Sequence, residues 1–236
     1  MITVCSVVYN DNKSEIFDLT MKSIIEYTIP CPQFIICDNG SNNVLEKYRY
    51  MDNVETVANE PSLKGGSNAH GESLNKIVSM VSTDYCAIVE SDCVILYDLN
   101  RLIKFDKSLV AIPKTDKLYH TFFLIGKTKK LQQVDFMPKT PSNGQSYKPK
   151  NDVGSRIGDV FSKDEIMPLT FIDCKTGGGN IFDSSFQSDE VVLGNKTIVL
   201  HFGRGSNIGG KAIRKGFKHP KYQLVEWKKK AEEILR

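Results

Sequence analysis

The sequence has little of several features that mark whole classes of protein. It holds 9 prolines and 17 glycines in 236 residues, too few for a collagen-like or low-complexity chain. Its longest apolar runs fall far short of the ~18–20 residues that a membrane-spanning helix needs. No basic segment followed by an apolar stretch and a small-residue cleavage site opens the chain, so we expect no signal peptide. The composition, 40% hydrophobic and 25% charged, is that of an ordinary globular protein.

Cysteine is present but lacks the spacing of a metal or disulfide framework. None of the six cysteines forms a C-x-x-C pair, and most lie in apolar runs, where a thiol acts as a small hydrophobic group. We therefore expect a reducing, cytoplasmic compartment, with neither disulfides nor a zinc site.

Charge is unevenly distributed along the chain. Residues 1–112 carry 9 Lys and Arg against 15 Asp and Glu, whereas residues 113–236 carry 22 against 13. The segment 204–236 alone holds 10 basic and 3 acidic residues. Such a tail can meet phosphates, an anionic membrane surface or nucleic acid, although a solvated basic helix is commoner. No nucleic-acid-binding motif accompanies it, so we expect no nucleic-acid partner and leave a peripheral membrane contact open.

Strand and helix patterns alternate through the first half. The run Ile2–Tyr9 is almost entirely apolar, as in a strand buried on both faces. Apolar residues at helical spacing follow it and end before Pro30. Further strands are predicted at Gln33–Cys37, Val54–Ala58 and Tyr85–Val89, and a second helix from Ser67 to Val81. This alternation indicates βαβ units and a mostly parallel sheet flanked by helices.

Polar clusters follow three of these strands: Tyr9-Asn10-Asp11, Asp38-Asn39 and Glu90-Ser91-Asp92. Ligands of an open parallel sheet bind beyond the carboxyl ends of its strands. We therefore expect these clusters to form one binding site.

The second half is less regular. Strands are predicted at Leu109–Pro113, Phe122–Ile125 and Lys196–His201, a short helix at 153–161 after an Asp152 cap, and a basic helix at Leu224–Leu235. No internal repeat and no clean linker appear, so we predict a single α/β domain over residues 1–236.

The order and spacing of these motifs resemble glycosyltransferase family 2 and related GT-A nucleotide-sugar transferases. The resemblance rests on Ile2–Asn10, on Phe34–Ser41, on the helix from Asn68 to Asn75, and on Asp84–Asp92, which matches the strand ending in an acidic DxD triplet. The resemblance covers about residues 1–95 and is weaker at His201. It implies that residues 1–112 bind a nucleoside diphosphate sugar and that residues 113–236 shape the acceptor site.

The resemblance also implies a divalent cation, Mn²⁺ or Mg²⁺, held by Asp92 and His201. Carboxylate oxygen and imidazole nitrogen suit such ions. Glu90 departs from the family's acidic triplet, in which an Asp stands first, and would reach ribose or the metal through water, with Ser91 beside it. A turn after a strand explains Glu90-Ser91-Asp92 equally simply, and a lone histidine often only caps a strand.

Other site residues are expected from the same resemblance. Asp38 would contact the nucleotide base or ribose, beside Tyr9 and Asn10. Lys64 would approach the nucleotide or its phosphates, and the loop that contains Arg204 would cover the diphosphate. An inverting transfer needs a carboxylate that takes the proton of the acceptor hydroxyl. Asp152 is the predicted base, with a simple helix cap as its alternative and Asp159 and Asp173 in reserve.

We therefore predict transfer of a sugar from a UDP- or GDP-sugar to a hydroxyl of a glycan or other acceptor, with inversion and metal dependence. Three alternatives stay open: a catalytically decayed nucleotide- or carbohydrate-binding protein, a sugar nucleotidyltransferase, and a basic nucleic-acid binder. A nucleotidyltransferase would carry a glycine-rich, arginine-bearing loop after its first strand, and the residues after Tyr9 offer none.

Overall fold

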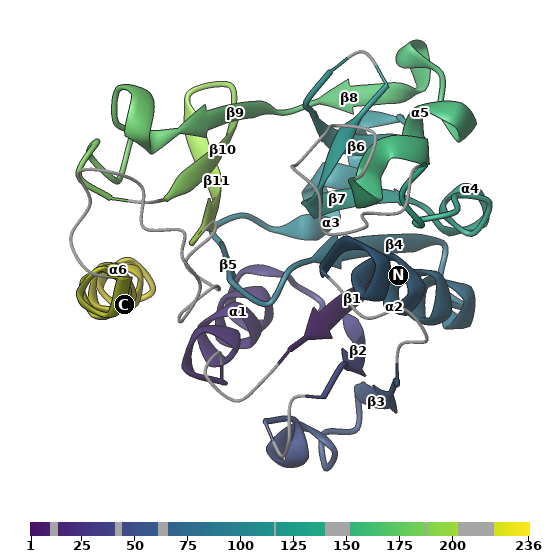
Figure 1. Cartoon of the computed structure of the whole chain (residues 1–236), viewed down its shortest axis with the longest axis horizontal. Coiled ribbons are helices and arrows are strands. Elements are labelled where there is room, and N and C mark those ends of the chain that lie inside the picture. The colour runs from purple at the N-terminus through teal and green to yellow at the C-terminus, as the bar shows by residue number, and fades with distance from the viewer. Residues whose placement is uncertain are drawn as a thin grey trace.

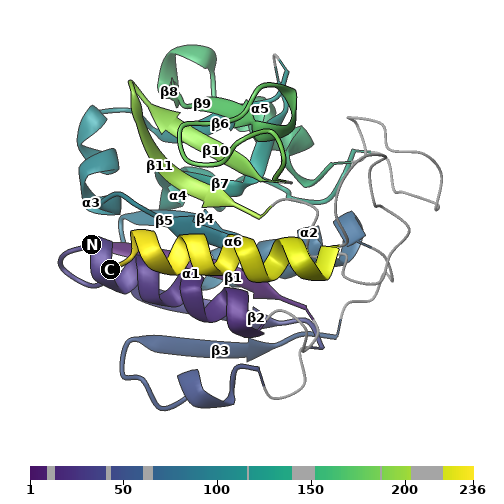
Figure 2. The same cartoon turned by 90° about the vertical axis from the view of Figure 1, so that its left-hand side faces the viewer.

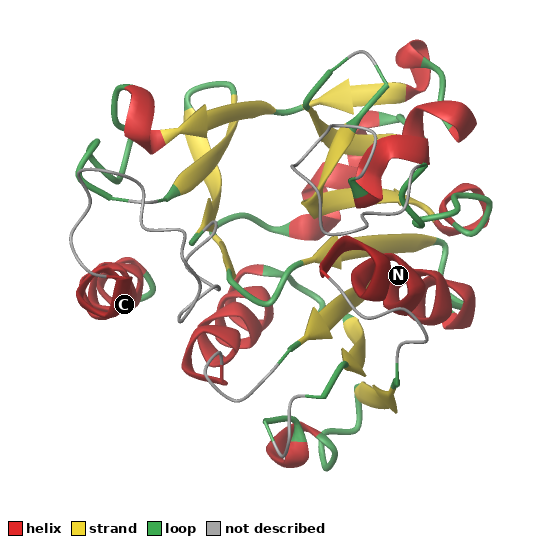
Figure 3. Ribbon diagram, in the orientation of Figure 1, coloured by secondary structure: helices red, strands yellow, loops and turns green. Residues whose placement is uncertain are grey.

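Two sheets of different construction organise the protein (Figures 1 and 3). The computed structural model describes residues 1–9, 14–40, 44–60, 66–115, 117–139, 152–186, 188–202 and 220–236. The strands are β1 (Ile2–Val8), β2 (Gln33–Asp38), β3 (Val54–Ala58), β4 (Tyr85–Val89), β5 (Cys93–Ile95), β6 (Leu109–Pro113), β7 (Tyr119–Lys127), β8 (Ile166–Pro168), β9 (Thr170–Asp173), β10 (Asp189–Leu193) and β11 (Lys196–His201).

The larger sheet has seven strands in the order β3-β2-β1-β4-β7-β6-β8. The first four strands are parallel to one another, and β7 runs antiparallel to both of its neighbours. All seven residues of β1 are buried, as its apolar sequence predicted, because helices cover both faces of the sheet at this strand. The predicted mixed α/β architecture with a mostly parallel sheet is thus confirmed.

The helices α1 (Ser14–Tyr27) and α2 (Gly66–Met80) pack on opposite faces of this sheet. Val4 of β1 belongs to the same apolar cluster as Phe17 of α1, whereas Cys5 belongs to the cluster of Leu74 in α2. The alternation follows from the two-residue period of a strand, which turns neighbouring side chains to opposite faces.

The smaller sheet has four antiparallel strands in the order β5-β11-β10-β9 (Figure 1). The sequence pattern predicted β11, but it did not predict this sheet. β5 has only three residues, and its partner β11 lies about a hundred positions further along the chain, so no local period reveals the pairing. The chain thus passes from β4 in one sheet directly into β5 in the other.

The C-terminal helix α6 (Pro220–Ile234) lies alongside α1 (Figure 2). Trp227 is fully buried and anchors α6 in a third apolar cluster with Ile16 of α1 and Phe202. The remaining helical segments are short: Glu46–Tyr48, α3 (Leu99–Leu102), Ile103–Phe105, α4 (Thr128–Leu131), Val153–Arg156, α5 (Ile157–Val160), Lys163–Glu165 and Cys174–Thr176. Within the described residues, no helix has the length and apolarity to cross a membrane.

Candidate metal and donor site

The parallel strands deliver their polar ends to one edge of the larger sheet. Val8 at the end of β1 pairs in register with Asp38 at the end of β2, and β4 runs parallel on the other side of β1. Asn39 donates its backbone N–H to Val8 O over 2.9 Å, which holds the turn after β2 against β1. The structure therefore brings Tyr9, Asp38 and Glu90 to the same edge of the sheet, as the sequence predicted.

A tight turn at residues 90–93 joins the two sheets. Cys93 donates its N–H to Glu90 O over 3.2 Å, and Glu90 donates its own N–H to Phe122 O over 2.9 Å. Across the turn, the N–H of Phe202 bonds Asp92 O over 3.0 Å. These bonds set Asp92 beside the carboxyl end of β11, where His201 lies.

His201 is the centre of a buried cluster of acidic side chains. Its Nε2 lies 3.4 Å from Asp92 Oδ1 and 3.9 Å from Glu90 Oε2, and its Nδ1 lies 3.2 Å from Asp189 Oδ2. The Sγ of Cys93 is also close: one ligand atom each from Asp92, Cys93 and His201 lies within 4.8 Å of the other two. The residues come from β11, from β10 and from the turn after β4.

The electrostatics of this cluster are dominated by the acids. Burial lowers the pKa of His201, but the charge of Asp92 and the hydrogen bond to Asp189 raise it to about 10. Without a cation the ring therefore carries a proton at neutral pH. Burial raises the pKa of the Cys93 thiol well above its usual value, and the charges of Asp92 and Glu90 add to the effect.

This donor set fits a divalent cation. Asp92 supplies a carboxylate oxygen whose side chain is only 4% exposed, and His201 supplies an imidazole nitrogen directed at it. Glu90 is more accessible, with 29% of its side chain exposed, so it can face a bound ligand. A divalent cation held by Asp92 and His201 would supply the positive charge that the proton on His201 otherwise supplies among these carboxylates.

The neighbouring edge of the site combines aromatic and amide groups. The Tyr9 and His70 rings meet edge to face at 6.0 Å, and His70 Nδ1 lies 3.9 Å from Glu90 Oε1. Burial raises the pKa of Tyr9, so its phenol stays protonated. Asn68, in the first turn of α2, has a buried Oδ1 that accepts no hydrogen bond from any described residue. Such an oxygen favours a bound ligand that donates a hydrogen bond to it.

Asp152 lies in a different kind of environment. Its Oδ1 accepts the N–H of Val153 over 2.8 Å at the start of the 153–156 turn, and its Oδ2 lies 2.8 Å from Lys114 Nζ. Gly154 lets this turn lie against β7, because a Cβ there would be 1.8 Å from Tyr119 O. The predicted cap is confirmed, and the carboxylate is also paired with a lysine.

The reserve carboxylates occupy two further positions. Asp159 is paired with Lys139 at 2.8 Å, on the surface. Asp173 ends β9 and faces Asp189 across the strand pair.

A row of four aromatic rings runs from His201, at the candidate metal site, into the half of the molecule that contains Asp152. His201 stacks on Phe122, with centroids 4.1 Å apart and an angle of 4° between the rings. Phe122 meets His120 at 5.3 Å, and His120 stacks on Phe171 at 4.8 Å. Burial lowers the pKa of His120 to about 4, and the charges of Lys114 and His201 act in the same direction. His120 is therefore neutral at pH 7.

Three of the predicted site residues, Asn10, Lys64 and Arg204, lie outside the described residues. The structure places four further residues at the site that the sequence did not predict there: His70, Cys93, Phe122 and Asp189. Only Cys93 carried a local signal, because it follows the acidic triplet directly. Asp189 and Phe122 reach the site through strand pairing that the sequence pattern does not display.

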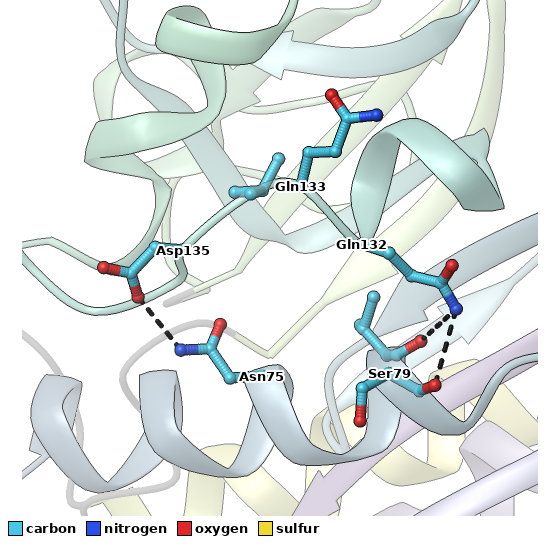
Figure 4. Close-up of a pocket in the computed structure, with 7 residues that line it drawn as sticks. Asn75, Ser79, Gln132, Gln133 and Asp135 are labelled. Carbon is cyan, nitrogen blue, oxygen red and sulfur yellow. Dashed lines mark hydrogen bonds between the residues drawn. The ribbon is translucent and has the colours of Figure 1, made fainter.

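A separate hollow of about 280 Å³ lies between the C-terminal half of α2 and the segment after α4 (Figure 4). Its polar side chains already have protein partners. Gln132 donates to Val78 O and Val81 O at the end of α2, and Asn75 donates to Asp135 over 2.9 Å. These bonds tie the end of α2 to the chain after β7, so the hollow is explained as a junction between elements.

Comparisons with known proteins identify the fold. No family model and no curated protein matches the sequence. Among solved structures, the galactosyltransferase LgtC in complex with donor and acceptor sugar analogues is similar, with a TM-score of 0.50 and 16% identity over 72% of this chain and 73% of that one. The glycosyltransferase GlyE of Streptococcus pneumoniae TIGR4 has a TM-score of 0.50 and 15% identity over 71% of this chain.

A mannosyltransferase of Pyrobaculum calidifontis, PcManGT, solved with GDP-Man and Mn²⁺, is less similar, with a TM-score of 0.45 and 13% identity over 56% of this chain. The chain spans less than half of this protein and of GlyE, 46% and 44% of their lengths. From the likeness to LgtC and GlyE, the chain has the GT-A fold of nucleotide-diphospho-sugar transferases.

Proposed function

We propose that the protein is a glycosyltransferase that moves a sugar from a UDP- or GDP-sugar to a hydroxyl of a glycan or other acceptor, with inversion and dependence on Mn²⁺ or Mg²⁺. The observation that carries the proposal is the cluster of Asp92, Glu90 and His201 at the carboxyl edge of the parallel sheet of a GT-A fold. Ligands of open α/β sheets bind at this edge.

The donor would lie along the ends of β1, β2 and β4, within residues 1–112. Asp38 would accept hydroxyl or base hydrogens of the nucleotide, beside Tyr9, and Glu90 and Ser91 would face the ribose and diphosphate. Asn10, Lys64 and Arg204 complete the proposed donor set as residues outside the described ranges. The Asn68 Oδ1 that accepts no hydrogen bond from the described residues supports binding of a nucleotide sugar at this edge, because a hydroxyl of the bound sugar or ribose could donate to it.

Asp92 and His201 would hold the cation, and Glu90, whose Oε2 lies 3.9 Å from His201 Nε2, would reach it through water. Bound there, a divalent cation neutralises the charge that develops on the leaving diphosphate. His201 must release its proton to become a ligand, and its stacking on Phe122 keeps the ring in place.

The acceptor would approach from the half formed by residues 113–236. Asp152 is the proposed base for the acceptor hydroxyl, and Asp159 and Asp173 are the reserves. Lys114 Nζ lies 2.8 Å from Asp152 Oδ2, so the proposed base would act from within this ion pair. The cytoplasmic location and the membrane contact of the basic tail stay predictions.

A donor screen tests the proposal. UDP- and GDP-sugars are offered with Mn²⁺ or Mg²⁺, and nucleotide release and pyrophosphate release are both measured, while calorimetry records UDP and GDP binding with and without Mn²⁺. We expect metal-dependent binding and release of nucleoside diphosphate. Pyrophosphate release would instead identify a nucleotidyltransferase. Metal-dependent binding with no turnover of any donor would identify a decayed binding protein.

A further inference from the structure

Asp189 lies directly across the strand pair from His201. The two residues are register partners in the antiparallel pair β10 and β11. The distance between Asp189 Oδ2 and His201 Nδ1 is 3.2 Å, and the two side chains are 15% and 11% exposed. The contact is therefore part of the folded sheet and does not depend on a flexible surface side chain.

This contact decides which ring nitrogen is available at the cluster. Nδ1 faces Asp189, so Nε2 faces Asp92 Oδ1 at 3.4 Å and Glu90 Oε2 at 3.9 Å. An Nδ1–H donated to a carboxylate fixes the tautomer and orientation of an imidazole that binds metal through Nε2. The stacking of the ring on Phe122 restricts its remaining rotation.

The backbone beneath the ring is held by the adjacent residue. Ser188 Oγ donates to His201 O over 3.2 Å and accepts the Nε1–H of Trp227 over 3.0 Å. Trp227 is fully buried in α6. Two consecutive residues, Ser188 and Asp189, thus hold the main chain and the ring of His201 separately.

We infer that Asp189 is the positioning residue that presents His201 Nε2 to the divalent cation. The inference rests on the proposed function, since the cation belongs to it, but it concerns a residue that neither the acidic triplet nor the fold assigns. Asp189 acts through His201, because it lies at Nδ1, whereas Asp92 and Glu90 lie at Nε2.

Glu190 offers a matched control on the same strand. It is fully buried, and its carboxylate accepts backbone N–H groups of residues 180–182 and the hydroxyl of Thr197. Neighbouring side chains of a strand point to opposite faces, so Glu190 stabilises the sheet from the other side. Glu190→Gln therefore perturbs β10 without removing the partner of His201.

The first measurement is Mn²⁺ affinity, read from the electron paramagnetic resonance signal of free Mn²⁺ with UDP or GDP present. We expect Asp189→Ala to bind Mn²⁺ about 10- to 100-fold more weakly, the usual cost of losing such a partner. Asp189→Asn keeps an acceptor oxygen and should restore part of the affinity. Glu190→Gln should keep the wild-type affinity even if its melting temperature falls.

The second measurement needs no metal. Ring ¹⁵N spectra report the protonation and tautomer of each histidine, and the signals of His201 are assigned with a His201→Gln variant. We expect Asp189→Ala to shift the Nδ1 signal of His201, and Glu190→Gln to leave it in place.

Wild-type Mn²⁺ affinity in a folded Asp189→Ala variant would overturn the inference. An equal loss of affinity in Asp189→Ala and Glu190→Gln would also overturn it, because that pattern reports general weakening of β10. If the wild-type chain binds no Mn²⁺ with either nucleotide, the metal site of the proposed function fails and the inference fails with it. Wild-type binding that Asp189→Ala retains overturns the inference alone and leaves the proposed function in place.

Discussion

Two aspartates of this protein, Asp92 and Asp152, show how one side chain can be set to different uses. Asp92 is almost fully buried against an imidazole, with Glu90 and Asp189 around the same ring. Asp152 is more exposed, and its two oxygens are taken by a lysine and a backbone N–H. The partner of Asp92 is His201, on which a metal ion can replace a proton. The partner of Asp152 is the ammonium group of Lys114.

The difference shows that local sequence does not decide what a carboxylate does. Both residues follow a polar stretch and precede a structured segment, and both can be explained as turn or cap residues from sequence alone. The counter-charge decides between them: acidic neighbours make the Asp92 region attract a cation, and Lys114 neutralises Asp152.

The largest effect is expected from Asp92→Asn. The variant keeps the shape of the side chain but removes the charge that a divalent cation requires, so metal-dependent binding of UDP or GDP should be lost. Calorimetry with and without Mn²⁺ measures the loss, and circular dichroism confirms the fold. Asp84→Asn, at an exposed position before β4, is the matched control and should bind normally. Normal Mn²⁺-dependent binding by Asp92→Asn would exclude Asp92 as a ligand.

Asp152→Asn tests the second aspartate of the comparison. If Asp152 is the base, transfer should fall about 10²- to 10⁴-fold, because an amide cannot take the proton, while donor and metal binding stay unchanged. Asn caps a helix nearly as well as Asp, so a loss of stability would report the lost ion pair with Lys114. Transfer rate and nucleotide affinity are measured on the same preparation. Wild-type transfer would reduce Asp152 to a cap and promote Asp159 or Asp173.

His120, which lies between the two regions, predicts a pH dependence of stability. Its pKa is about 4 when folded and near 6.5 when unfolded, so between these values the unfolded chain binds the extra proton. The contribution of His120 to the free energy of unfolding is therefore complete above pH 6.5. It is lost as the pH falls to 4, and the loss is at most about 3 kcal/mol. His120→Phe, which keeps the stack on Phe171, should lack this loss. Urea unfolding at pH 7, 5.5 and 4.5 compares the two proteins, and parallel pH profiles would contradict the prediction.

The smallest effect is expected from Trp227→Phe, which removes the Nε1–H that supports Ser188 behind His201. Losing a buried hydrogen bond and some packing should lower the free energy of unfolding by about 1–3 kcal/mol. Val225→Ala, on the exposed face of α6, should change it by less than about 0.5 kcal/mol. Chemical unfolding measures both variants. Equal stability of Trp227→Phe and wild type would show that this contact does not support the strand.

The parallel part of the fold was predictable because its signals are local. The apolar run of β1, the helical spacing of α2 and the polar ends of β2 and β4 each lie within a few residues, and parallel strands necessarily bring their carboxyl ends together. Asp92 and Asp38 could therefore be placed at one edge of the sheet from the sequence.

The smaller sheet was not predictable in the same way. β5 is three residues long, and its pairing with β11 joins positions 93 and 201. Register between such distant strands depends on how the whole chain packs, and no periodicity within either strand reports it. The link between His201 and the acidic triplet came from resemblance, and the structure supplies the contact.

By itself, the sequence determined which segments become buried strands and helices and that acidic groups collect at one sheet edge, because burial and periodicity are properties of neighbouring residues. Only the tertiary structure decided that Asp189 faces His201 and that Lys114 pairs with Asp152. The charge state of a side chain depends on which charges lie within a few ångströms in space, and strands far apart in the chain bring those charges together.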